Sequence, residues 1–244
     1  MSLDKKEIPG TDFKELGQLK WPVAVSGYRI IEKPDYSGLP SLEPNKYKWN
    51  YIEPFKTPDL YFKLSQTDEN NEQAILDFVN EHGALGGDTL VDISNCKETL
   101  QHFQLQVRLL RELIDLWYNI YKKKDRSFEE LSELEKLNEQ LPAKFSHFSI
   151  LQGAKFKLAH EIVWHLEKNG VYPSMLMNSK ADMKPIYSSK TLIGALYLQF
   201  YLAFTNRQQL KKCQCGNLFP AYGKRMYCST KCKNRYVMRE RRKK

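Results

Sequence analysis

The sequence predicts a mainly α-helical protein, of the α+β type with few short strands, in which a helical body carries a small cysteine-rich module at its C-terminal end. Three observations support this. Apolar residues recur at helical spacing in several segments between residues 72 and 205. Four of the five cysteines fall between residues 213 and 232. The basic residues concentrate in the same C-terminal part of the chain.

Length and composition are those of a globular protein. The chain has 244 residues, of which 41% are hydrophobic and 12% aromatic, which is enough to bury a core without covalent cross-links. Its apolar runs are shorter than the ~20 residues that span a bilayer, and the first residues lack the apolar stretch of a signal peptide. We therefore expect a cytoplasmic protein that does not associate with membranes.

The net charge of +9 is unevenly distributed. Residues 207–244 contain 13 Lys and Arg and a single acidic residue, Glu240, which amounts to a formal +12. The remaining 25 basic and 28 acidic residues leave the rest of the chain at −3. A strongly basic end on a nearly neutral body indicates a polyanion-binding segment, with nucleic acid the leading candidate and a merely solvated tail as the alternative.

Residues 1–65 are predicted to form an irregular, proline- and aromatic-rich arm that packs on the body. Dense prolines favour turns and extended segments, although 21–31 has the composition of a short strand. The prolines are Pro34, Pro40, Pro44, Pro54 and Pro58, and the aromatic residues expected to contact the body are Trp49, Tyr51, Phe55 and Tyr61.

Residues 66–208 are predicted to form the helical body. Helices are expected over 72–80, ending at Gly83, and over roughly 97–123, where apolar residues step by three and four. The length of the second helix leaves open a contact between two protomers, as in a homodimer. Glycines 83, 86 and 87 lack the Lys-Ser/Thr of a phosphate-binding loop, so we exclude a nucleotide site there.

Further along the body, we expect a helix capped by Ser127 and ending before Pro142. In the next segment, His160 and His165 are five residues apart, not the four of a zinc protease motif, and are expected to be structural. A short hairpin over 170–187 and a helix over about 189–205, capped by Ser188 or Ser189, complete the body.

Residues 209–244 contain the clearest chemical signal. Cys213 and Cys215, then Cys228 and Cys232, form two close pairs joined by a linker in which Pro220 and Gly223 supply turns, the pattern of a structural four-cysteine zinc site. In a reducing compartment such a cluster indicates a metal site and not disulfides; the fifth cysteine, Cys96, has no accompanying motif. We expect one structural zinc ion in a small treble-clef-like finger, shielded by Phe219 and Tyr227. Gly216 should relieve the turn after the first pair, and Ser229 should cap a terminal helix that contains Cys232.

That terminal helix is predicted to bind nucleic acid. Arginine side chains suit phosphate oxygens and base edges, and asparagine can recognise adenine. Arg235, Arg239 and Arg242 recur at i, i+4 and i+7, which places them on one face. The candidate nucleic-acid-binding residues are Lys231, Lys233, Asn234, Arg235, Arg239, Arg241 and Arg242.

The cysteine module resembles the CGNR zinc-finger family of bacterial proteins, which are thought to regulate transcription. The resemblance rests on Cys215-Gly-Asn-Leu-Phe219, on Tyr227-Cys-Ser-Thr-Lys-Cys-Lys-Asn-Arg235 and on the arginines that follow. The family pairs this finger with an N-terminal domain, called ABATE, that opens on a Leu-Asp-Phe-Val-Asn pattern, here Leu76–Asn80. Two departures concern the finger: Lys233 replaces the signature glycine, and the first cysteine pair is tighter than usual. The resemblance implies a DNA-binding regulator.

We therefore expect a non-enzymatic, DNA-binding transcription regulator whose body senses an unidentified small-molecule effector or forms an oligomer. One alternative is a module that binds RNA or an acidic protein through the same finger. Another is an enzyme with its site in the body, for which a pocket gathering Asp77, Glu81 and His82 would be required.

Overall fold

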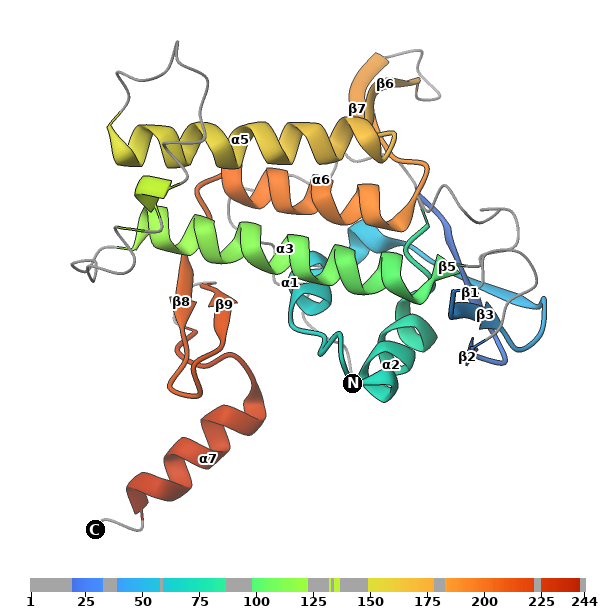
Figure 1. Ribbon diagram of the computed structural model, residues 1–244, viewed down its shortest axis with the longest axis horizontal. Coiled ribbons are helices and arrows are strands. Elements are labelled where there is room, and N and C mark those ends of the chain that lie inside the picture. Colours follow the sequence, from blue (N-terminus) through green and yellow to red (C-terminus); the bar gives the residue numbers. More distant parts are fainter. Residues whose placement is uncertain are drawn as a thin grey trace.

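The structure is a computed structural model in which a mainly helical body carries a small C-terminal module, as the sequence predicts (Figure 1). The described residues are 19–32, 39–57, 59–86, 98–122, 132, 134–136, 149–177, 183–221 and 225–241. Within these ranges, no helix combines the length and the apolar character needed to cross a membrane.

Three long helices form the body: α3 (Leu100–Tyr121), α5 (Ile150–Lys168) and α6 (Leu192–Thr205). They lie side by side, with α6 in contact with both of the others (Figure 1). Ten of the 14 residues of α6 are buried, so this helix is the centre of the core. A helix that is apolar on all sides must be covered on all sides, which explains why the other elements gather around it.

The helix predicted over 97–123 is observed as α3, two or three residues shorter at each end. Its apolar residues form the expected buried seam, from Phe103 to Trp117, whereas Tyr121 at its end is half exposed. The Trp117 ring lies 5.6 Å from that of Phe200 on α6, in a tilted arrangement. This contact joins the two helices through aromatic side chains.

The predicted start of the last body helix is wrong by two or three residues. Thr191 caps α6, because its hydroxyl accepts a hydrogen bond from the amide of Gly194 at 3.1 Å. Ser189 instead donates its hydroxyl hydrogen to the carbonyl oxygen of Thr191. Adjacent Ser and Thr residues are equally good caps by composition, so tertiary packing decides between them.

The N-terminal segment is more regular than predicted. Strand β1 (Trp21–Ala24) pairs antiparallel with β4 (Trp49–Ile52). Strand β2 (Tyr28–Ile31) pairs with β3 (Ser41–Pro44), and β3 also pairs with the two-residue strand β5 (Glu98–Thr99). The strand considered for 21–31 is observed as β1 and β2, whereas the expectation of an irregular segment is wrong over 41–44 and 49–52, where β3 and β4 form. Four-residue strands interrupted by prolines carry too little alternation to be recognised without their partners.

Aromatic side chains attach this segment to the body, although not in the combination expected. Phe55, in the short 3-10 helix η2 (Pro54–Lys56), and Tyr61, in α1 (Leu60–Ser65), are buried as predicted, whereas Tyr51 is 64% exposed. The main anchor is Trp21, whose indole nitrogen donates to the carbonyl oxygen of Ala84 at 2.8 Å.

Helix α2 (Glu72–His82) and the hairpin of β6 (Tyr172–Met177) with β7 (Met183–Ser188) confirm their predictions. Gly83 ends α2 with a φ of +85°, the positive value expected for a glycine at a helix end.

The two histidines of α5 serve structure, as expected. His160 is exposed, and His165 is buried with its ring stacked 4.2 Å from that of Tyr197. Of the helix predicted over 127–141, residues 132 and 134–136 are helical, and the rest of it lies outside the described residues, as does Cys96.

Gln199 joins α6 to the N-terminal segment. Its buried amide nitrogen donates to the carbonyl oxygens of Pro54 at 2.8 Å and Thr57 at 3.0 Å, and its amide oxygen accepts from the backbone nitrogen of Tyr61 at 3.4 Å. One side chain therefore holds the turn between η2 and α1 against the most buried helix.

Replacing Gln199 should destabilise the body. We expect Gln199→Leu to lower the free energy of unfolding by about 2–4 kcal/mol, because two buried carbonyl groups lose their donor. Urea unfolding followed by circular dichroism measures this. Gln101→Leu, at an exposed position of α3, is the control and should change it by less than about 0.5 kcal/mol. Equal stabilities of the two variants would contradict the assignment.

Candidate metal centre and basic helix

The first cysteine pair lies in a tight loop between two short strands, β8 (Leu210–Lys212) and β9 (Leu218–Pro220). The amide of Cys213 donates to the carbonyl oxygen of Asn217 at 2.8 Å, and the amide of Gly216 donates to that of Cys213 at 2.9 Å. Gly216 has a φ of +93°, as the predicted turn requires. We call residues 213–217 the knuckle loop. Its tight turn brings the two cysteines of the pair onto one side.

The second pair lies at the start of α7 (Thr230–Arg241). The hydroxyl of Ser229 accepts a hydrogen bond from the amide of Cys232 at 3.2 Å, which is the cap predicted from the sequence. Cys232 therefore occupies the first turn of α7, and Cys228 immediately precedes the cap. Any ion held by these two residues is attached directly to the helix.

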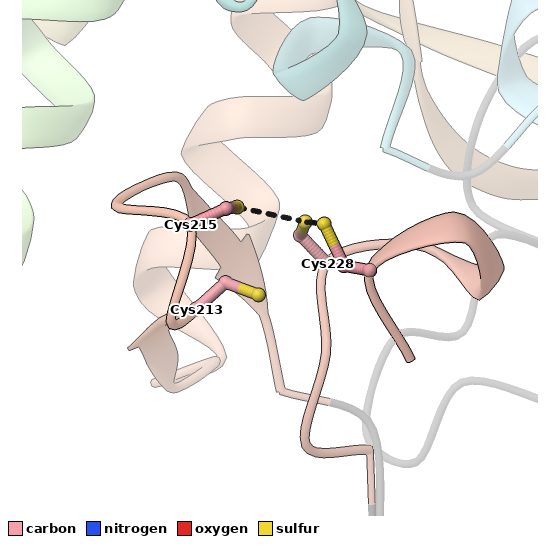
Figure 2. Close-up of side chains that lie close together, drawn as sticks. Cys213, Cys215 and Cys228 are labelled. Atoms are coloured by element: carbon pink, nitrogen blue, oxygen red, sulfur yellow. Dashed lines mark hydrogen bonds between the residues drawn. The ribbon is translucent and has the colours of Figure 1, made fainter. Parts of the chain in front are cut away.

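The four cysteine sulfurs converge. All lie within 4.8 Å of one another, with 3.4 Å between the sulfurs of Cys228 and Cys232. Figure 2 shows Cys213, Cys215 and Cys228, with 3.5 Å between the sulfurs of Cys215 and Cys228. Four sulfurs placed tetrahedrally at ~2.3 Å from a zinc ion would be about 3.8 Å apart. All four are free thiols and not disulfides. The group thus has the donor number, type and spacing to hold a metal ion, and Cys213, the most buried member, belongs to it.

The thiols of the group differ in acidity. Burial raises the pKa of Cys213, but hydrogen bonds from the backbone amides of Cys215 and Cys228 outweigh it and lower the pKa to about 6. Burial and the adjacent sulfurs, that of Cys232 first, raise the pKa of Cys228 to about 12. Neighbouring thiolates repel, so the four cannot all ionise alone. A bound divalent ion removes this conflict and deprotonates its ligands.

Arg225 supports the second pair, a role that its place in a basic sequence did not reveal. Its guanidinium donates to the carbonyl oxygens of Tyr227, at 3.0 Å, and Cys228. The same group lies 5.4 Å from the centre of the Phe219 ring. Arg225 therefore fixes the segment carrying Cys228 against the hairpin. In the sequence, this role could have been inferred from the position of Arg225 three residues before Cys228.

Apolar side chains join the metal centre to the body. Phe219, on β9, is 1% exposed and packs in the same core as α3 and α6. Tyr227 is partly buried against this core, and its ring lies 5.5 Å from that of Tyr236 on α7. Both rings are thus withdrawn from solvent in the core that Cys213 shares, and their shielding of a metal ion stays a prediction. The cysteine module therefore shares the core of the body.

Helix α7 carries the basic residues away from the body (Figure 1). Six of the seven residues predicted to bind nucleic acid lie on the described part of the helix, and all six are exposed; Arg242 lies outside the described residues. The six are Lys231, Lys233, Asn234, Arg235, Arg239 and Arg241.

One face of α7 concentrates this chemistry. At ~100° per residue, Lys231, Asn234, Arg235 and Arg241 fall within an arc of roughly 120°, and Met238 lies at its centre. Met238 is 59% exposed. The arc points away from Tyr236, which lies on the side of α7 that faces the metal centre. The described side chains of this face are all exposed, and they combine cations with an apolar side chain. Met238 was not among the predicted site residues.

Of the three residues that an enzyme site in the body would require, two are in contact: Glu81 Oε1 lies 3.2 Å from His82 Nε2. Asp77 and Glu81 are exposed on α2, where Asp77 accepts from Gln73 at 2.7 Å. His82 is buried, and burial lowers its pKa to about 4. The cleft seen among the described residues lies elsewhere, between α3 and the knuckle loop.

A comparison of the chain with models of known protein families and with curated proteins found no match. The resemblance to the CGNR zinc-finger family stays a prediction based on the residues of the cysteine module. The geometry of the four sulfurs and the charge of α7 provide the physical basis for assigning a function.

The purified protein should contain one zinc ion per chain. Mutation of residues that only hydrogen-bond to metal ligands typically lowers metal affinity by roughly 10- to 100-fold. Loss of one of four thiolate ligands should lower it further, so we expect Cys213→Ser to weaken zinc binding by more than about 100-fold. Competition with a chromophoric chelator measures this. Gln214→Ser, at the exposed position between the two cysteines, is the control. Unchanged affinity in Cys213→Ser would show that Cys213 is not a ligand.

Proposed function

We propose that this protein binds duplex DNA through α7, that a structural zinc ion holds this helix in place, and that the protein is a transcription regulator of the CGNR type. One observation carries the proposal: the exposed basic face belongs to a helix whose first turn supplies one of four convergent cysteines, Cys232. The cluster and the charged helix are thus one unit.

The proposed role of zinc is structural. Four cysteines complete a tetrahedral shell and leave no position for a reactive water, whereas catalytic zinc keeps such a position open. In the described structure, α7 has few contacts with the body, and the aromatic contact of Tyr236 is with Tyr227 of the cysteine module itself. Zinc coordination by Cys228 and Cys232 would therefore supply much of the free energy that orders this helix.

Charge and shape favour DNA as the partner. The segment from residue 207 onwards has a formal charge of +12, whereas the rest of the chain is at −3. An isolated α-helix fits the major groove of B-form DNA, where lysine and arginine contact phosphates and guanine, and asparagine contacts adenine. An exposed Met238 at the centre of the face offers an apolar contact for a thymine methyl group. The deep, narrow major groove of RNA admits no helix in this way.

A single finger reads few base pairs, so sequence specificity requires a second copy. Two-fold symmetric regulators obtain it by placing two recognition helices on successive half-sites. We accordingly propose that the protein acts as a homodimer on DNA, with contacts between bodies.

Removing the cations of α7 should abolish most DNA affinity. We expect the triple variant Arg235→Gln, Arg239→Gln and Arg242→Gln to bind at least about tenfold more weakly at 100 mM salt, with the slope of log K against log salt smaller by about 2–3, because three phosphate contacts are lost. Fluorescence anisotropy with a labelled duplex measures both quantities.

The matched control is Lys20→Gln, Lys46→Gln and Lys48→Gln, which removes the same charge from exposed positions of the N-terminal sheets. It should retain nearly full affinity. An equal loss of DNA affinity in both triple variants would show that binding depends on the net charge of the protein and not on these arginines. Absence of salt-dependent binding by the zinc-loaded protein would contradict the proposal, and stronger competition by RNA than by DNA at matched salt would indicate an RNA partner.

A further inference from the structure

A surface cleft separates the helical body from the knuckle loop. It has a volume of about 450 Å³, within the range of small-molecule sites. One wall comes from α1, α3 and the segment that follows α1, and the other comes from Gly216, Asn217 and Leu218. The side-chain amide of Gln66 donates to the carbonyl oxygen of Leu218 at 2.8 Å and joins the two walls. A ligand in this cleft would touch both the body and the cysteine module.

The lining of the cleft is mixed: most of the residues that line it are polar or charged, and three carry apolar side chains. Phe62 and Ile114 belong to the core of the body and are nearly buried, and Leu218 contributes from the start of β9. An aromatic ring in such a lining also favours a cation placed against it. The lining thus suits a ligand with an apolar stem.

The charges around the cleft select a cation. Its single guanidinium, that of Arg111, is already engaged: it binds Glu69 in a bidentate manner at 3.0 and 2.8 Å and donates to the carbonyl oxygens of Ser65 and Thr67. Asp68 and Asp115 then remain as carboxylates without a bound cation among the described residues. An anionic ligand would face two carboxylates, against which the nearby Lys212 is a single positive charge.

Asp115 is the residue best placed to bind the ligand. Its side chain is open to solvent yet recessed in the cleft, and the surrounding protein raises the pKa of its carboxyl group despite the attraction of Arg111 and Lys212. Within the described parts of the chain, no hydrogen bond or close ion pair engages this carboxylate. An ammonium or amidinium group would supply the missing donors.

We propose that this cleft binds a small organic cation, an amine or amidine on an apolar stem, and that Asp115 receives its charged end. This inference goes beyond the proposed DNA binding and does not depend on it. Because the knuckle loop forms one wall, the site exists only when the cysteine module is folded.

Three probes of similar size and different charge test the proposal: 2-phenylethylamine, 2-phenylethanol and phenylacetate. Titrations of the zinc-loaded protein, followed by calorimetry or by NMR, should show saturable binding of the amine and not of the alcohol or the acid. Equal binding of amine and alcohol, or no saturable amine binding up to millimolar concentration, would overturn the proposal.

Two further measurements locate the site. Asp115→Asn should weaken amine binding at least about tenfold, since it keeps the shape and removes the charge. Glu112→Gln, on the same helix but outside the cleft, should not. Chelation of zinc should abolish amine binding while the circular dichroism of the body persists. Unchanged binding in Asp115→Asn or in the chelated protein would overturn the assignment to this cleft.

Discussion

Four sulfur atoms within 4.8 Å of one another are the constraint on which the C-terminal part of this structure depends. Thiolates at that distance repel one another. In keeping with this, the pKa of Cys213 is lowered whereas that of Cys228 is raised. A divalent ion converts the repulsion into four bonds. Since Cys232 lies in the first turn of α7 and Cys228 just before it, an ion bound by the four sulfurs would also fix the direction of the basic helix.

The cysteine module is also part of the body. Phe219 is buried in the core that α6 organises, Gln66 bonds to the backbone of Leu218, and Arg225 holds the second ligand segment over the Phe219 ring. These contacts hold the hairpin of β8 and β9 against the body, whereas α7 extends from it with its basic face exposed. The hairpin thus positions the cysteine module on the body, whereas α7 is free to contact a partner. The cleft lies beside the knuckle loop, between the body and this module.

Local signals predicted the helices and the hairpin of the body because 3.6-residue periodicity, caps and glycines act within a few residues of one another. The same holds for Ser229 and Gly216 in the cysteine module. Strands β3 and β4 of the N-terminal segment were missed because part of their stabilisation is distant: β3 (Ser41–Pro44) pairs with β5 (Glu98–Thr99) across more than 50 residues. Pairing at that range leaves no local pattern in short, proline-containing segments.

The sequence by itself determined the chemistry of this protein: which residues can ligate a metal, where the positive charge is concentrated and which segments are helical. Composition and short-range spacing carry that information. The tertiary structure alone decided which groups meet: that Cys213 completes the cysteine group, that Arg225 supports a ligand segment and not a partner, and that Asp115 faces the knuckle loop across a cleft. These are contacts between segments distant in sequence, and only the packing of a complete core around α6 brings them together.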